Sequence, residues 1–213
     1  MRTEHQAEAF PTELHQERLR TVLQALLRSG AQSVLDLGCG SGALLRLLMS
    51  EPQFTRITGV DTSIEALSVA EQELCGGPCP EGERVSLLHA SYADSDRRLE
   101  GYDAAAMVET IEHVDPSRLS TVEQAVFARY RPKTVVMTTP NIEYNVLFGM
   151  AEGALREPDH RFEWNRAKFR AWAMGVAKRN GYAVAFDGIG EEHTMLGCPT
   201  QMATFTRTTN RAD

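Results

Sequence analysis

Two carboxylates and an imidazole lie close together in the sequence, at Glu109, Glu112 and His113. Their i, i+3 and i+4 spacing brings the three side chains together if the chain turns helically there. Such groups repel one another unless a positive charge lies between them, and carboxylates with imidazoles are suitable ligands for a divalent metal. The alternative is that the acids favour the first turn of a helix and that His113 is a satisfied polar residue. The spacing alone supports both interpretations equally.

A further imidazole, His160, follows in residues 159–164. If His160 folds back over the same edge, two carboxylates and two imidazoles can surround one ion. Four protein ligands leave two positions of an octahedral ion open, and these suit the two oxygens of a vicinal diol such as a terminal ribose. The ion would act as a Lewis acid on one hydroxyl. Two histidines favour Mn²⁺ or a similar borderline ion, with Mg²⁺ as the second choice.

A glycine loop, with Gly38, Gly40 and Gly42, follows one apolar strand-like segment and precedes a helix-like one. Glycines let the backbone approach a ligand at the carboxyl edge of a sheet, and Asp61 ends the next strand, where a carboxylate can accept hydrogen bonds from a ribose. A nicotinamide dinucleotide would also satisfy the glycine spacing. Asp36 argues against it, because a carboxylate just before the loop repels a pyrophosphate and attracts an ammonium. S-adenosylmethionine (SAM), which has an ammonium and no phosphate, fits this pattern, which resembles the SAM-binding motifs of Rossmann-like methyltransferases.

The elements that must position these groups alternate along the chain. The 213 residues suit one α/β domain, and the alternation predicts a parallel sheet with helices on both sides. Strands are expected at residues 33–37, 56–60, 85–88, 102–108, 133–138, 182–186 and 201–206, the last two as a hairpin-like pair. Helices are expected at residues 12–29, 43–49, 62–74, 116–130 and 165–180. We divide the chain into a polar leader (1–11), a domain (12–207) with an irregular insert at about 139–166, and a polar tail (208–213).

The net charge of −7 argues against broad, phosphate-driven binding of long nucleic acid, but a local basic patch could still bind one end of a nucleic acid. Such a patch is present in the sequence, and its simpler interpretation is a solvated loop and helix face. Its members are Arg156, Arg161, Arg166, Lys168 and Arg170.

Four cysteines are scattered along the chain without the partners that a zinc site needs. Cys39 is expected to be a small buried filler, and Cys75 and Cys79 are expected to be reduced loop thiols. No apolar run is long enough to cross a bilayer and the polar start is not a signal peptide, so we expect a cytoplasmic protein with no membrane contact.

Four motifs make the chain resemble a known family, over about residues 18–206. They are Glu-x-x-Glu-His at 109–113, Thr-Thr-Pro-Asn-x-Glu-Tyr-Asn at 138–145, Asp-His-Arg-Phe-Glu-Trp at 159–164 and Pro-Thr-Gln-Met-Ala at 199–203. The chain resembles the HUA-enhancer type small-RNA 3′-terminal 2′-O-methyltransferases, especially their bacterial RNA-repair branch. The resemblance implies an α/β Rossmann-like methyltransferase fold, with a mostly parallel seven-stranded sheet, an antiparallel last strand and helices on both faces.

The resemblance also implies site residues, cofactors and partners. It implies methyl transfer from SAM to the 2′-hydroxyl of the 3′-terminal nucleotide of RNA, with one metal bound to both ribose hydroxyls. The partners would be an RNA 3′ end and an RNA-repair polynucleotide kinase-phosphatase and ligase. The implied metal ligands, which are also the catalytic groups, are Glu109, Glu112, His113 and His160. The expected SAM contacts are Asp36, Gly38, Gly40, Asp61, Thr62 and Ser91, with Ser91 beside the adenine. The expected RNA contacts are Asn141, Tyr144, Asn145 and Arg161, with Arg166 as a second candidate for a phosphate.

The chain departs from the family pattern at Glu157, where relatives usually have a histidine. Three other functions remain to be separated from RNA methylation. A catechol-like diol could chelate the same metal as a small-molecule substrate, the domain could bind SAM without catalysis, and a nicotinamide-dependent oxidoreductase would require tight dinucleotide binding despite Asp36.

Overall fold

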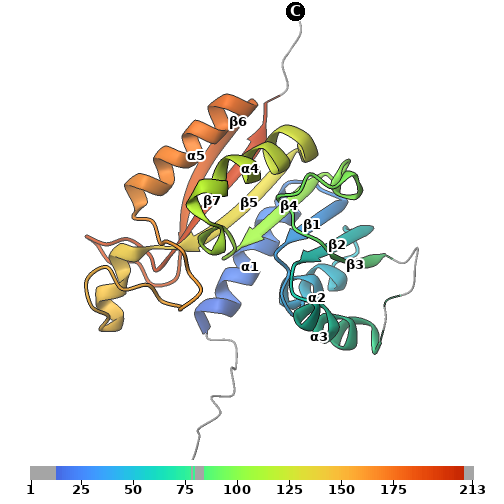
Figure 1. Ribbon diagram of the computed structural model, residues 1–213, viewed down its shortest axis with the longest axis horizontal. Coiled ribbons are helices and arrows are strands. Elements are labelled where there is room, and N and C mark those ends of the chain that lie inside the picture. The colour runs from blue at the N-terminus through green and yellow to red at the C-terminus, as the bar shows by residue number, and fades with distance from the viewer. Residues whose placement is uncertain (1–12, 78, 80–83, 209–213) are drawn as a thin grey trace, which may run out of the picture.

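The computed structural model describes residues 13–77, 79 and 84–208. A single seven-stranded sheet, in the order β3-β2-β1-β4-β5-β7-β6, carries helices on both faces (Figure 1). The strands are β1 Ser33–Leu37, β2 Arg56–Asp61, β3 Val85–His89, β4 Ala104–Val108, β5 Thr134–Pro140, β6 Tyr182–Ile189 and β7 Thr200–Arg207. The α-helices are α1 Glu13–Arg28, α2 Ala43–Ser50, α3 Ile64–Cys75, α4 Leu119–Glu123 and α5 Arg166–Asn180. The shorter helical segments are η1 Arg97–Leu99, η2 Ile111–His113, η3 Pro116–Arg118, η4 Gln124–Tyr130 and η5 Ile142–Phe148.

All neighbouring strands from β3 to β5 pair in parallel, and β7 pairs antiparallel to both β5 and β6. The predicted fold, a mostly parallel sheet with one antiparallel last strand, is therefore confirmed. The central strands are apolar and buried along nearly their whole length, as expected when helices cover both faces of a sheet. All parallel strands end at the same edge, where the loops that carry the motifs gather.

Two hydrophobic cores hold the helices on the sheet. One lies between the sheet and α4, η4 and α5, with Phe127, Phe169 and Phe205 among its fully buried side chains. The other lies between the sheet and α1, α2 and α3, and includes Leu26, Leu45 and Cys39. Cys39 is 7% exposed, so its predicted role as a buried filler is confirmed.

Element boundaries differ from the sequence predictions in a few places. The helix expected from residue 62 begins at Ile64, after the cap Ser63, whose side chain accepts a hydrogen bond from the backbone N–H of Ala66. The single helix expected at 116–130 is divided into 3₁₀, α and π segments. Asn165 caps α5 and Gly181 ends it in the left-handed region, so the helix expected at 165–180 is confirmed. The predicted leader, Thr12 and residues 209–213 of the tail lie outside the described residues.

The prediction that Cys75 and Cys79 are reduced loop thiols is wrong. The structure joins them by a disulfide. Gly76 ends α3 with a φ of +70°, and this left-handed turn reverses the chain so that the two Cα atoms are 5.4 Å apart. The sequence shows the spacing of the two cysteines but not this reversal.

Candidate active site

A cavity of about 750 Å³ opens at the carboxyl edge of the sheet, beside the ends of β1, β2 and β4. One part of its wall carries five of the six residues predicted to bind the cofactor: Gly38, Gly40, Asp61, Thr62 and Ser91. Another part carries Glu109, His113 and Arg161, which were predicted to act on the acceptor. The fold therefore brings the predicted donor and acceptor residues to one cavity.

The glycine loop and Asp61 are fixed to each other. The backbone N–H of Gly40 donates to one carboxylate oxygen of Asp61 at 2.8 Å, and the backbone N–H of Ser63 donates to the other at 2.8 Å. Gly38 has a φ of +84°, and a Cβ atom there would lie 2.5 Å from Cγ2 of Thr110. Only glycine fits this position, so the loop backbone can form the cavity wall.

Asp36 lies behind this wall on β1 and is 2% exposed. Burial, followed by the nearby Asp61 charge, raises the pKa of Asp36 from 3.8 to about 7. A cation placed beside Asp36 would favour its ionised form. This environment fits the ammonium group of SAM, which is what the sequence predicts for Asp36.

Three of the four predicted metal ligands form a cluster. The ligand atoms of Glu112, His113 and His160 all lie within 4.8 Å of one another. The two imidazole rings meet edge to face, with centroids 4.9 Å apart. Glu112 is fully buried and His160 is 8% exposed, whereas His113 faces the cavity. Residues 47 positions apart in the sequence meet because the segment after η5 returns to the end of β4, where the backbone N–H of Arg161 donates to the carbonyl oxygen of Glu112 at 2.7 Å.

The fourth predicted ligand, Glu109, lies beside this cluster and not in it. Glu109 has a φ of +51°, and its N–H donates to the Thr138 carbonyl oxygen of β5, so the helical turn begins only at Ile111. The expected i, i+3, i+4 arrangement on one helix is therefore wrong, because Glu109 still belongs to the strand end. Its carboxylate faces Arg18 of α1 at 3.3 Å.

Neighbouring side chains orient the cluster. The Thr139 hydroxyl donates to one oxygen of Glu112 at 3.0 Å. Nδ1 of His160 lies 2.7 Å from Glu163, whose side chain is fully buried. A proton on Nδ1 is therefore held by Glu163, which leaves the lone pair of Nε2 for a ligand. Asp159 lies 3.2 Å from Nδ1 of His113 and has the same effect there.

The cluster meets the requirements of a divalent cation. One oxygen of Glu112 and one of Glu109 are buried without a hydrogen-bond partner among the described residues. Burial raises the pKa of both carboxyl groups, and the Glu109 charge adds to the effect on Glu112. Glu109 already faces Arg18, but the fully buried Glu112 has no ion pair among the described residues, and a buried carboxylate is costly without a compensating charge. The oxygen and imidazole ligands present are those that Mn²⁺ and Mg²⁺ accept.

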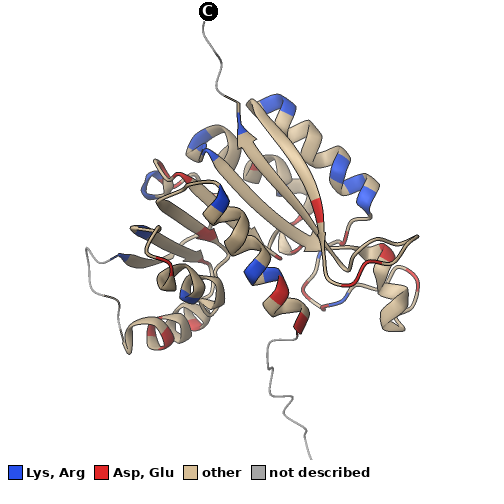
Figure 2. Ribbon diagram, turned by 180° about the vertical axis from the view of Figure 1, so that it is seen from behind, with Lys and Arg blue, Asp and Glu red and all other residues tan. Residues whose placement is uncertain are grey.

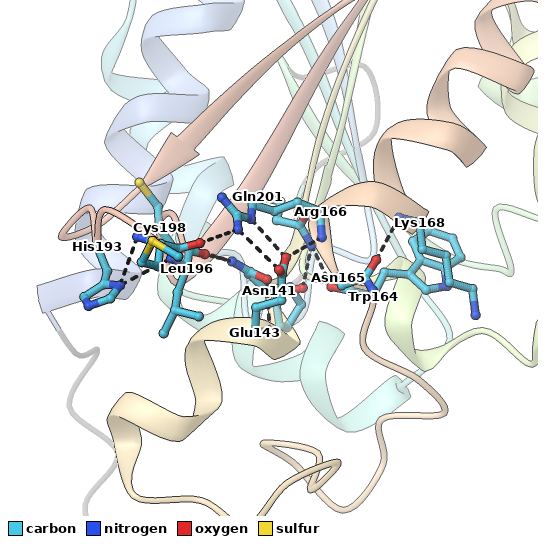
Figure 3. A network of polar contacts seen from close by, with 12 residues as sticks. Asn141, Glu143, Trp164, Asn165, Arg166, Lys168, His193, Leu196, Cys198 and Gln201 are labelled. Carbon is cyan, nitrogen blue, oxygen red and sulfur yellow. Dashed lines mark hydrogen bonds and ion pairs between the residues drawn. The ribbon is translucent and has the colours of Figure 1, made fainter.

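Two of the predicted RNA contacts belong to the scaffold. Asn141 is fully buried, its amide group donates to the carbonyl oxygens of Leu196 and Cys198, and its side-chain oxygen accepts from the Glu143 N–H (Figure 3). Tyr144 is 6% exposed and packs on Phe148. Neither side chain lines the cavity, and their contact with substrate stays a prediction.

The other predicted RNA contacts also divide into residues that hold the scaffold and a residue that lines the cavity. Asn145 is buried and holds Glu163 and Arg156. Arg166 is bound to Glu143 and to the Met195 carbonyl oxygen, so it ties α5 to the loop between β6 and β7 (Figure 3). Arg161 lines the cavity, as predicted for a substrate contact.

Glu157, which stands in place of the family histidine, is exposed. Its side chain belongs neither to the metal-type cluster nor to the cavity wall. The departure from the family pattern therefore leaves the cluster complete.

Sequence reasoning missed four residues that hold the site together. Thr139 and Glu163 lie within the motifs, and Thr139 carries no recognisable ligand spacing of its own. Arg18 donates at 3.1 Å to Thr200, which lies 182 residues away in the sequence, and it also pairs with Glu109. Arg156 donates to Asn145 and to the Pro199 carbonyl oxygen. The i, i+3 spacing of Glu163 after His160 was the one usable signal among them.

Comparisons with known proteins agree with the fold. A family model described as "Methyltransferase domain" matches residues 34–133. The small RNA 2′-O-methyltransferase of Mus musculus is 36% identical over 209 residues, which cover 93% of this chain and 52% of that protein. The chain thus spans about half the length of the curated relatives it matches.

Two solved structures share the whole fold. The methyltransferase domain of bacterial CtHen1-C has 45% identity and a TM-score of 0.83, and the match covers 92% of this chain and all of that one. The small RNA methyltransferase HEN1 has 31% identity and a TM-score of 0.84, over 97% of this chain and 27% of that one. The fold and the cavity define a Rossmann-like, SAM-dependent methyltransferase. Within that class, the chain belongs to the Hen1 methyltransferase family.

Proposed function

We propose that this chain transfers the methyl group of SAM to the 2′-hydroxyl at the 3′ end of an RNA, with the help of one divalent metal. The observation that carries the proposal is the Glu112, His113 and His160 cluster, whose His113 lines the cavity together with Gly40 and Asp61. Relatives that cover nearly the whole chain are named small RNA 2′-O-methyltransferases.

SAM would be held by residues that the fold has already oriented. Asp61 has both oxygens anchored by backbone N–H groups, so its remaining lone pairs can accept the ribose hydroxyls. Asp36 would balance the ammonium group, and Ser91 would lie beside the adenine. The glycine loop allows the cofactor to lie directly on the backbone at Gly38 and Gly40.

The acceptor end would be organised by the cluster. Glu112, His113 and His160, with Glu109 as the fourth group, would hold the metal, which when bound supplies Lewis-acid activation of a ribose hydroxyl. Glu163 and Asp159 fix the two imidazoles so that one nitrogen of each faces the cluster. Arg161 at the cavity wall would contact a phosphate of the RNA. These contacts would hold the hydroxyl beside the SAM methyl group, which is the main requirement for a displacement between bound reactants.

Two proposals concern the metal and the protein partners. The two imidazoles favour Mn²⁺ over Mg²⁺. An RNA-repair kinase-phosphatase and ligase would supply the repaired RNA end. A structure titled "Structure of the Pnkp1/Rnl/Hen1 RNA repair complex" has 19% identity to this chain, so that similarity supports the fold alone.

The test uses labelled SAM with two RNAs that differ only in having a 2′-hydroxyl or a 2′-deoxy 3′ terminus. Each is assayed with Mn²⁺, with Mg²⁺ and with a strong chelator. We expect labelling of the hydroxyl-terminated RNA only, and none with the chelator. Turnover of a catechol with neither RNA labelled would replace this proposal by small-molecule methylation.

A further inference from the structure

Helix α5 has a charge opposite to that of the rest of the chain. It contains five basic and no acidic residues among its 15, in a protein of net charge −7. Figure 2 shows blue bands near both ends of α5 and no red along it. The basic residues are Arg166, Lys168, Arg170, Lys178 and Arg179.

The position of these cations is not explained by helix stability. Lys178 and Arg179 lie in the last turn, where the helix dipole favours positive charge. Arg166, Lys168 and Arg170 lie near the start, where the dipole disfavours it, and the first turn has no acid. A charge placed against the local preference is expected where function requires it.

Two of the three unfavourable cations are also unpaired. Glu143 balances Arg166. Lys168, Arg170 and Lys178 form no ion pair among the described residues, although the Arg170 guanidinium lies over the Phe186 ring at 5.3 Å. Asn165 caps the helix, so the side chains and not the first N–H groups are available to an anion.

The helix geometry arranges these three cations around one exposed face. With about 100° per residue, Lys168 and Arg170 lie on the two flanks of this face, and the small exposed residues Ala167 and Ala171 lie between them. Lys178 lies on the same face about 15 Å further along the axis. Met174, which is 53% exposed, also lies on this face, so the face has apolar side chains in its middle and positive charge at both ends.

A short segment joins the active site to the start of α5. Arg161 lines the cavity, and its N–H is bonded to Glu112. The chain then runs through Trp164, which pairs with Asn141, directly into α5. In Figure 1, α5 begins near the loops at the carboxyl edge of the sheet and runs away from them along the sheet. An RNA whose 3′ end lies in the cavity could extend along this helix.

We propose that the exposed face of α5, with Lys168, Arg170 and Lys178, binds the phosphates of the RNA upstream of its 3′-terminal nucleotide. This proposal rests on the proposed function, because it requires an RNA end in the cavity. Positive side chains that contact phosphates give affinity without sequence preference. The face would therefore lower the KM of longer RNAs and leave the methyl-transfer step unchanged.

The test compares a trinucleotide with a single-stranded RNA of about twenty nucleotides as methyl acceptors. The variant carries Lys168→Gln, Arg170→Gln and Lys178→Gln, and the matched control carries Arg20→Gln, Arg28→Gln and Arg97→Gln, which removes three exposed charges elsewhere. We expect the α5 variant to raise the KM of the long RNA about tenfold, with unchanged kcat and an unchanged KM for the trinucleotide. Binding of the long RNA should lose about 2 from its salt-dependence slope, at about 0.7 for each single-strand contact.

A second variant, Lys168→Gln with Lys178→Gln, keeps Arg170 on Phe186 and should show a smaller loss of the same kind. A long-RNA KM equal to that of the control variant would overturn the α5 proposal, as would an equal loss on both RNAs. If the unaltered chain methylates both RNAs, the proposed function stands whatever the variants show. If it methylates neither, the proposed function itself fails.

Discussion

Replacement of Asp36 by asparagine should change how the stability of the SAM-free protein depends on pH. Asp36 lies in the middle of the sheet, opposite Gly59 of β2 and Ala106 of β4, and its folded-state pKa is raised from 3.8 to about 7. Between these two values the unfolded chain has lost the proton that the folded protein retains. The folded state then binds more protons, so stability falls as pH rises through this window. Asparagine removes this dependence because it does not ionise.

The size of the effect follows from the shift. Each pKa unit corresponds to about 1.4 kcal/mol, and between pH 5 and pH 8 the ionisation of Asp36 should cost the folded protein about 2–3 kcal/mol. The buried asparagine has its own constant cost of about 1–3 kcal/mol if its amide group finds no partner. The pH-dependent difference between the two proteins is therefore the informative quantity, and the absolute stability is not.

Urea unfolding at several pH values, without SAM, measures this difference. The wild type should lose about 2–3 kcal/mol more than Asp36→Asn between pH 5 and pH 8. Asp187→Asn, which removes an exposed carboxyl group on β6, is the control and should follow the wild type. SAM should stabilise the wild type more at pH 8 than at pH 5, because its ammonium favours ionised Asp36. Parallel stability curves for wild type and Asp36→Asn would refute the reasoning.

Three further outcomes are expected. Glu112→Gln should raise the melting temperature of the metal-free protein at pH 8, since burial raises the pKa of this carboxyl group, and should weaken Mn²⁺ binding more than about a hundredfold in calorimetry; an unchanged Mn²⁺ affinity would exclude Glu112 as a ligand. Glu163→Gln should weaken Mn²⁺ binding about ten- to a hundredfold through loss of the His160 contact, while SAM binding stays the same; loss of both would indicate a general structural role. Gly59→Ala should destabilise the fold by about 1–3 kcal/mol in urea unfolding, because the new Cβ would lie 2.6 Å from Leu45; a neutral result would mean that the core can shift.

In the part of the chain that the structure describes, no helix is long and apolar enough to cross a membrane. This agrees with the absence of a long apolar run from the sequence. The prediction of a cytoplasmic location stays a prediction.

The sequence was sufficient for the fold because local signals and the global arrangement agree. Alternating apolar segments, the capping residue Asn165 and the terminating Gly181 place helices and strands correctly. The glycine loop and Asp61 could also be recognised locally, since the positive φ of Gly38 and a carboxylate at a strand end are features of the sequence near each residue. Cys75 and Cys79 were misjudged because their bond depends on the turn between them.

The sequence by itself determines which groups are present at the edge of the sheet: a glycine loop, two aspartates, and a set of carboxylates and imidazoles. Only the tertiary structure decides which of them meet. It brings His160 to Glu112 and His113, moves Glu109 to the side with Arg18, and buries Asn141 in the scaffold. The physical reason is that strand ends and long loops are positioned by packing and hydrogen bonds between distant segments, which no local spacing encodes.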